Sequence, residues 1–310
     1  MSRRLQPLSP LLGAHMSVAG GLPLAVERAV AHRCDAFQIF TKNGNQWRGR
    51  IVPPEEIREF RTRVEAAQIG PVVSHASYLI NLATTSPALR RQSIEAMGDE
   101  MDRAEALGLL GVVLHPGCYT QGNEADAPGL IAAALSELLS DRAGGRTMVL
   151  LEQTAGQGTS VGARFEHLAA ILAEANGHAR LGVCLDTCHL LAAGYDLRSA
   201  AGYADTFEQF ARLVGFGRLK LFHLNDSKKP LGSRVDRHEH IGQGFLGLAP
   251  FRRLVNDPRF RGLPMLLETP KTDGRGPRIV SVDPLDAQNL DTLRRLIRRH
   301  SNRRLTDSPS

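Results

Sequence analysis

Residues 182–196 read GVCLDTCHLLAAGYD, an apolar run that ends in a carboxylate and is followed closely by a histidine. The run predicts a buried strand that ends at Asp186. Two cysteines stand four residues apart in the same stretch, so two interpretations compete. Either Cys184 and Cys188 form a metal or redox site, or Asp186 and His189 carry the chemistry while the thiols pack.

The same pattern recurs along the chain, because short apolar runs alternate with longer amphipathic ones. Such alternation is typical of parallel βαβ units. No GxGxxG turn follows the first run, which disfavours a dinucleotide-binding open sheet. Eight such apolar runs, each followed by an amphipathic one, favour one closed (β/α)8 TIM barrel, with its active site at the carboxyl ends of the strands. The predicted strands span 11–15, 36–40, 71–75, 111–115, 147–152, 181–186, 219–226 and 264–268.

Bulk composition limits the classes of protein that the chain can belong to. We expect one barrel domain over residues 11–300, a flexible basic tail at 1–10 and a polar tail at 301–310. The formal charge of +6 is compatible with a polyanionic partner. Four cysteines are too few for a disulfide framework in 310 residues. With no signal core and no membrane-length apolar run, we expect a cytoplasmic protein that has no membrane partner.

Seven of the eight apolar runs end in a titratable residue, if the run within 219–226 is taken to end at His223; the exception is the run that ends in Phe40. The carboxyl ends of barrel strands open on one face. Grouped there, the carboxylates would repel one another and the histidines would lose hydration, unless divalent cations relieve both. Imidazole and carboxylate ligands suit zinc or manganese, and more than four ligands imply more than one ion. The seven residues are His15, His75, His115, Glu152, Asp186, His223 and Glu268.

Two further features extend this set. His189 lies three residues after Asp186, where a short turn could bring it to the same face. The segment 223–244 supplies Asp236 and His238, whose spacing of two places both side chains on one side of an extended segment. A further metal position is therefore expected, although these residues alone do not choose between His238 and His240.

Eight motifs, in order over about residues 11–298, match one known family. The chain resembles the endonuclease IV family of abasic-site DNA repair nucleases. The matching stretches are GAHMSVAGG (13–21), FTKNGNQWR (40–48), SHASYLINLA (74–83), LHPG (114–117), LEQTAGQG (151–158), GVCLDTCHLLAAGYD (182–196), HLNDSKKPLGSRVDRHEHIGQG (223–244) and LLETP (266–270).

The resemblance implies three zinc ions per chain, with manganese as a substitute, and nine ligands. It selects His238 over His240, and it assigns His15 a hydrogen-bonding role and no ion. The implied ligand sets are His75, His115 and Glu152 for the first ion, Glu152, Asp186, His223 and Glu268 for the second, and His189, Asp236 and His238 for the third.

The implied reaction is hydrolysis of the phosphodiester 5′ to an abasic site in duplex DNA, which leaves a 3′-hydroxyl and a 5′-deoxyribose phosphate. Two catalytic roles follow from the resemblance: Glu152 bridges the ion pair, and Glu268 orients or deprotonates a zinc-activated water. Whether the enzyme also cleans 3′ ends as a phosphodiesterase stays open. We expect a monomer that acts on double-stranded DNA.

Three loops offer groove contacts, phosphate contacts and side chains that could wedge into a base stack. Trp47 is equally well interpreted as a packed aromatic residue, and Asn45 stands where some family members carry arginine, which weakens the expected wedge. The expected DNA-contacting residues are Asn43, Gln46, Trp47, Arg48, Tyr78, Leu79, Asn225, Ser227, Lys228 and Arg234.

Three other functions compete with this one. A sugar isomerase on a related barrel would use one or two metals and would not need the third ligand set. A basic DNA-binding protein without activity would not need every ligand position filled. A Schiff-base lyase is disfavoured because no predicted strand ends in lysine. Within 182–196 we expect both thiols to pack, with Cys184 inside the barrel.

Overall fold

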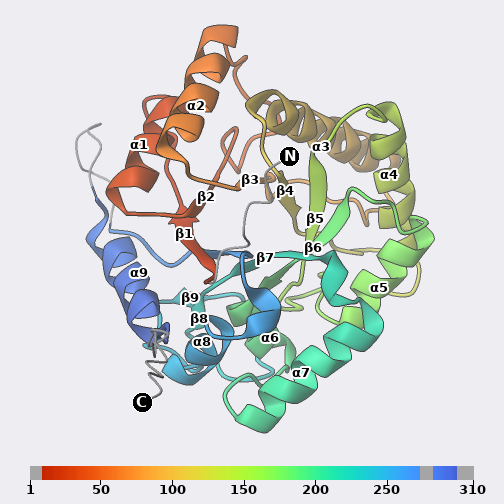
Figure 1. Ribbon diagram of the computed structural model, residues 1–310. Coiled ribbons are helices and arrows are strands. Elements are labelled where there is room, and N and C mark those ends of the chain that lie inside the picture. Colours follow the sequence, from red (N-terminus) through yellow and green to blue (C-terminus); the bar gives the residue numbers. More distant parts are fainter. Residues whose placement is uncertain (1–8, 273–281, 299–310) are drawn as a thin grey trace, which may run out of the picture.

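Within the described residues, eight parallel strands close into a barrel that is surrounded by helices (Figure 1). The structure is a computed structural model and describes residues 9–272 and 282–298. The strand order around the ring is β1-β10-β7-β6-β5-β4-β3-β2, which confirms the predicted single (β/α)8 barrel. The strands are β1 (Leu11–His15), β2 (Ala36–Ile39), β3 (Val72–His75), β4 (Gly111–Leu114), β5 (Met148–Glu152), β6 (Leu181–Asp186), β7 (Leu219–His223) and β10 (Pro264–Leu267).

Helices follow the strands along the chain and form the outer layer. The longest, α3, starts after Ser86, whose side chain accepts a hydrogen bond from the amide of Leu89, and it stops at Gly108, whose φ is 71°. None of the described helices is both long and apolar enough to cross a bilayer. The helices are α1 (Leu22–Ala31), α2 (Pro54–Ala67), α3 (Pro87–Leu107), α4 (Ala127–Asp141), α5 (Phe165–Glu174), α6 (Thr187–Ala193), α7 (Ala200–Leu213), α8 (Leu248–Leu254) and α9 (Pro284–Leu296).

The predicted strand 219–226 is too long. The barrel strand β7 ends at His223, and β8 (Asp226–Ser227) leaves the barrel to pair antiparallel with β9 (His238–Glu239). In this pairing Ser227 lies opposite His238. The small two-stranded sheet therefore brings a predicted ligand from a distant loop back to the barrel. Apart from Ser9 and Pro10, the predicted tails fall outside the described residues, as do residues 299 and 300 of the predicted barrel domain.

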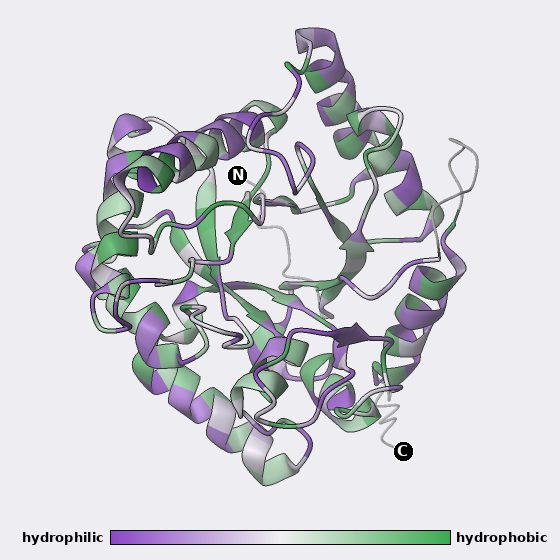
Figure 2. Cartoon of the chain, turned by 180° about the vertical axis from the view of Figure 1, so that it is seen from behind, coloured by the Kyte–Doolittle hydropathy of each residue, from purple (hydrophilic) through white to green (hydrophobic). Residues whose placement is uncertain are grey.

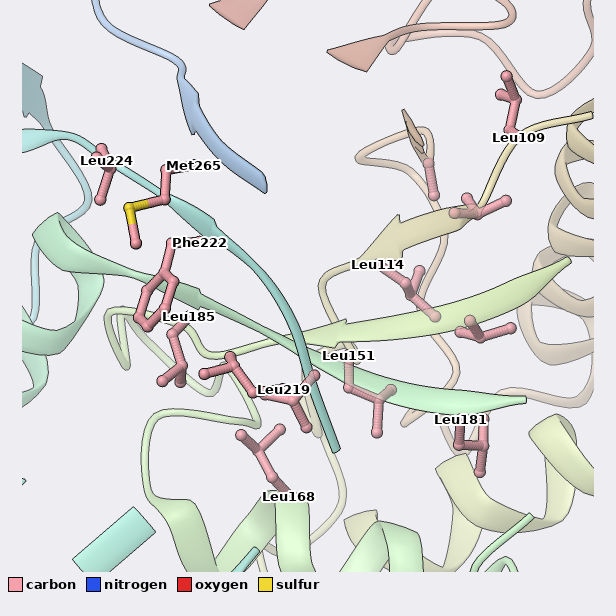
Figure 3. Close-up of a cluster of buried hydrophobic side chains, with 14 of the residues drawn as sticks. Leu109, Leu114, Leu151, Leu168, Leu181, Leu185, Leu219, Phe222, Leu224 and Met265 are labelled. Atoms are coloured by element: carbon pink, nitrogen blue, oxygen red, sulfur yellow. The ribbon is translucent and has the colours of Figure 1, made fainter. Parts of the chain in front are cut away.

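Alternation along the strands divides the core into two layers. One set of side chains packs outward against the helices, as Leu114, Leu151 and Phe222 do in Figure 3. The other set fills the barrel interior. Figure 2 shows the corresponding hydropathy, with apolar colour concentrated on the strands and polar colour on the outer faces of the helices. The interior residues are Ala36, Val73, Val113, Leu150, Cys184, Leu221 and Leu266.

Candidate metal centre

Six of the nine predicted ligands stand two residues beyond the interior layer. His75 follows Val73 on β3, and Glu152 follows Leu150 at the same spacing on β5, two strands away. Because strand side chains alternate with a period of two, residues at this spacing point to the same side. The titratable groups therefore form the next layer of the barrel interior, at its carboxyl-terminal mouth.

The first ligand group consists of His75, His115 and Glu152, whose ligand atoms lie within 4.8 Å of one another. Oε2 of Glu152 lies 3.1 Å from Nε2 of His75 and 3.0 Å from Nε2 of His115. Nδ1 of His75 donates to the carbonyl oxygen of Ala76 at 2.8 Å. That bond assigns the proton to Nδ1 and leaves Nε2 free to bind an ion.

The second group consists of Glu152, Asp186, His223 and Glu268. Nδ1 of His223 lies 2.8 Å from Oε1 of Glu152 and 3.1 Å from Oε2 of Glu268. Asp186 caps α6, since its Oδ1 accepts from the amide of His189 at 2.9 Å. Glu152 thus belongs to the first group through one oxygen and to the second through the other, which is the geometry that a bridging carboxylate requires.

The third group consists of His189, Asp236 and His238. Each imidazole Nε2 lies 3.2 Å from a different oxygen of Asp236. Their Nδ1 atoms donate to backbone carbonyls, of Gln153 at 2.9 Å and of Glu268 at 3.1 Å. Within the described part of the chain, both Nε2 atoms are buried and make no hydrogen bond of acceptable geometry. Buried polar atoms normally have partners, so these orphaned nitrogens fit an ion-binding position.

Comparisons with known proteins identify the family. A family model described as a xylose isomerase-like TIM barrel matches residues 26–301. A probable endonuclease 4 from Chloroflexus aurantiacus is 49% identical over 288 residues, which cover 93% of this chain and 98% of that protein. Another, from Geobacter sulfurreducens, is 46% identical over 300 residues, covering 97% and 99%. The chain belongs to the endonuclease IV family.

Solved structures support the same assignment. Endonuclease IV from Thermus thermophilus has a TM-score of 0.80 at 40% identity, covering 93% of this chain and 98% of its own. A D-tagatose 3-epimerase-like protein has a TM-score of 0.68 at 18% identity, a likeness that shows the fold alone. As an endonuclease IV family member, the protein is a hydrolase of the AP endonuclease class, and the sugar-isomerase alternative is excluded.

The acidic and imidazole groups of this endonuclease IV family member stabilise each other's charged forms. Burial raises the pKa of Glu152, but the charges of His223 and His115 outweigh it and hold this pKa well below its ordinary value. Burial lowers the pKa of His238, but Asp186 and Asp236 raise it to about 9. The ligand cluster therefore carries protons at neutral pH, and a divalent ion would displace them on binding.

Gln38, which is not among the residues predicted from the sequence, contacts two of the predicted ligands. Its buried Oε1 accepts from Nε2 of His223 at 2.9 Å, and its Nε2 donates to Oε1 of Glu268 at 2.5 Å. The same Nε2 lies 3.0 Å from Nδ1 of His15, and burial lowers the pKa of His15 to about 3, so His15 is a neutral acceptor. The sequence did contain one indication of this role. Gln38 is the only polar residue in the apolar run 36–40, which is the run without a titratable end.

The two cysteines of the 182–196 stretch are buried. Cys184 lies in the interior layer, and Sγ of Cys188 donates to the carbonyl oxygen of Arg237 at 3.6 Å. Each sulfur lies within 4.8 Å of two ligand residues. However, burial raises the pKa of Cys184 to about 12 and raises that of Cys188 as well. Thiols that stay protonated compete poorly with the carboxylates beside them.

The expected DNA-contacting residues divide by burial. Tyr78 is 58% exposed, and its ring lies 5.4 Å from that of His75, at the edge of the metal centre. Trp47 and Leu79 are half-buried, and Trp47 packs against the core as the alternative interpretation held. The exposed residues are Asn43, Gln46, Arg48, Tyr78, Lys228 and Arg234.

Two of the ten residues that we expected to contact DNA, Asn225 and Ser227, are buried, so the expectation that their side chains contact phosphates is wrong. Nδ2 of Asn225 donates to Oδ2 of Asp186 at 2.6 Å, and its Oδ1 accepts from the amide of Glu268 at 2.9 Å. The hydroxyl of Ser227 donates to the carbonyl oxygen of Lys229 at 2.9 Å. Neither side chain reaches solvent, so Asn225 holds two predicted ligands in place and Ser227 secures the loop that follows β8.

Proposed function

We propose that the protein hydrolyses the phosphodiester 5′ to an abasic site in duplex DNA, leaving a 3′-hydroxyl and a 5′-deoxyribose phosphate. The observation that carries this proposal is the two-sided environment of Glu152, beside a third ligand group in which Nε2 of His189 and Nε2 of His238 are buried and make no hydrogen bond within the described residues. Adjacent ion positions can hold the attacking and leaving oxygens of one displacement together. Relatives named endonuclease 4 support the same reaction class.

Three zinc ions suit this site, with manganese as a substitute. The donors are imidazoles and carboxylates in groups that share one carboxylate, and these donors favour zinc over magnesium or calcium. When bound, the ions would lower the pKa of water and stabilise negative charge on the leaving oxygen. The chain itself supplies the shape of the site and fixes the orientation of each donor.

Glu268 is positioned to act on the attacking water. Its Oε1 accepts from Gln38 at 2.5 Å, which fixes the carboxylate plane, and its Oε2 faces the second ligand group through His223. A carboxylate held this way can orient a water molecule and accept its proton. Glu152 has the other catalytic role, because its two oxygens keep the first and second groups at a constant separation.

The exposed residues around the barrel mouth would bind the DNA. Tyr78 stands beside the metal centre, where an aromatic ring can fill the space left by a nucleotide that has turned out of the helix. The side chain of Asn45 is shorter than that of arginine and would insert less far into the base stack. The cationic side chains Lys228 and Arg234 are exposed on the loop after β8 and would contact phosphates, which predicts salt-dependent binding.

The test uses a duplex oligonucleotide that carries one central abasic site. We expect a single incision 5′ to the site, ligatable 3′-hydroxyl ends, loss of activity with a chelator and recovery with zinc. Metal analysis of the purified protein should approach three ions per chain. The matched duplex without the abasic site should stay intact. Removal of the blocking group from a duplex with a 3′-phosphoglycolate end would show 3′-end cleaning. Light scattering measures the molar mass and so tests the expected monomer.

Two outcomes would contradict the proposal. Covalent trapping of the protein on abasic DNA by borohydride, with cleavage on the 3′ side, would identify a lyase. DNA binding without incision in the presence of zinc would identify a binding protein that lacks activity.

A further inference from the structure

A buried carboxylate away from the metal centre joins two loops at the barrel mouth. Glu100 lies on α3 and is 1% exposed. Its Oε2 accepts from the hydroxyl of Thr41 at 2.7 Å, in the loop after β2. Its Oε1 accepts from the backbone amide of Ser77 at 3.2 Å, in the loop after β3. One side chain therefore fixes the starts of both loops, although it belongs to none of the described ligand groups.

A buried lysine completes this connection. The side chain of Lys42 is 1% exposed, and its ammonium lies 3.4 Å from Oε1 of Glu100 and 3.1 Å from Oδ2 of Asp99. It also donates to the carbonyl oxygens of Trp47 at 3.1 Å and Ala96 at 3.3 Å. The ammonium thus ties the far end of the 41–47 loop back to its start and to α3.

The two loops are also bonded directly to each other. The carbonyl oxygen of Gly44 accepts from the hydroxyl of Ser77 at 2.8 Å and from the amide of Tyr78 at 3.0 Å. Gly44 packs so closely that an added Cβ would lie 3.1 Å from the ring of Phe40. The loops 41–47 and 76–79 are therefore connected to each other as well as to α3.

A contribution to the free energy of folding does not by itself explain why Lys42 and Glu100 form a fully buried ion pair. Burying two charges costs desolvation free energy, and apolar residues of similar size often replace such pairs without loss of stability. What the pair provides is directional bonding, because two acceptor oxygens and an ammonium reach partners on two loops and α3. Such a network selects one loop conformation from several.

We propose that Lys42 and Glu100 are positioning residues that hold the loops 41–47 and 76–79 as one preformed DNA-binding rim. This inference rests on the proposed abasic-DNA substrate. Preformed loops spare the ordering cost when DNA binds, so the pair controls affinity for the substrate and leaves the chemical step to the metal centre.

The single tryptophan allows a test that needs no DNA. Trp47 lies in the loop, and its backbone carbonyl is a direct acceptor of Lys42. In the zinc-loaded full chain, Lys42→Met and Glu100→Gln should lower the fluorescence anisotropy of Trp47 and increase acrylamide quenching about twofold, while zinc content stays at the wild-type value. Asp102→Asn is the matched control, because Asp102 lies on α3 like Glu100 and the change breaks its ion pair with Arg142, outside the two loops.

Kinetics on abasic duplex supply the second measurement. We expect KM to rise about tenfold with kcat within about twofold, the pattern of lost binding interactions. Unchanged Trp47 fluorescence together with unchanged KM would overturn the inference. So would lower zinc content and kcat with KM unchanged, since the pair would then act on the metal centre. If the wild type fails to cut abasic DNA but Trp47 still responds, the proposed substrate fails and the loop connection stands.

A second set of variants covers the case in which the single changes do not fold. Lys42→Met combined with Glu100→Gln leaves no lone buried charge, which is the costly condition. Ser77→Ala removes one bond between the loops without touching a charge. Both should change Trp47 quenching and KM in the same direction as the single variants, and a wild-type response from both would refute the positioning role.

Discussion

Oε1 of Glu152 lies 2.8 Å from Nδ1 of His223, at the centre of the barrel mouth. The other oxygen of Glu152 faces two more histidines, so one carboxylate stands between separate ligand groups. His223 is held from its far side by Gln38. The pair therefore has little freedom to rearrange.

Glu152→Gln should remove ions as well as activity. The amide has one oxygen in place of two, so it cannot serve both groups. We expect the bound zinc to fall from about three ions per chain to about one, held by the third group. Metal analysis after dialysis against metal-free buffer measures this. Retention of three ions would show that Glu152 does not bridge.

Glu268→Gln should lower the rate of cleavage while leaving the fold intact. Nε2 of Gln38 can still donate to the amide oxygen, so the fold is preserved. We expect kcat to fall by about 10²–10⁴-fold, the usual effect of losing a general base. Circular dichroism serves as the control for folding. Near-normal cleavage of abasic duplex would remove Glu268 from the catalytic assignment.

Gln38→Leu tests the residue that orients two predicted ligands. The substitution keeps the approximate volume but removes the partners of His223 and Glu268. Loss of such an orienting group typically lowers metal affinity or activity about 10–100-fold. Competition with a chromophoric chelator measures the affinity. Wild-type affinity and activity in this variant would mean that the ligands hold their own positions.

Asp226→Asn should destabilise the loop that follows β9. Oδ2 of Asp226 accepts from the amides of Gly242, Gly244 and Gly247, and its Oδ1 accepts from that of Leu246. An amide NH₂ in place of Oδ2 would face three donors. Leaving them unsatisfied should lower the free energy of unfolding by about 2–4 kcal/mol. Urea unfolding monitored by circular dichroism measures the change, and a loss below about 0.5 kcal/mol would contradict this account.

Zinc binding to the metal-free protein should tighten as pH rises. Burial alone would lower the pKa of His238, but Asp186 and Asp236 raise it to about 9. At pH 7 the imidazole is therefore protonated, and an ion must displace that proton. Because fewer protons remain to be displaced at higher pH, the apparent affinity increases between about pH 6 and 9. Calorimetry in buffers of different ionisation enthalpy should detect proton release, and pH-independent binding would contradict this prediction.

The barrel and most of the centre were predictable from local sequence. Strand side chains alternate with a period of two, and the carboxyl ends of barrel strands share one face. A polar residue that ends an apolar run is therefore placed by its own strand. That is why His75, Glu152 and His223 could be assigned to one face. Their roles as ligands stay a prediction.

Only the tertiary structure decided which polar groups meet. Gln38 and Glu268 are 230 residues apart, yet share a hydrogen bond, and no local pattern reports such a contact. The burial of Asn225, the turn of the chain after His223 and the connection from Glu100 to two loops have the same origin. Strand patterns arise from the residue and its neighbours, whereas hydrogen-bond partners depend on where distant segments pack. The sequence thus determined the strands and the chemistry at their ends, and packing determined how that chemistry is held.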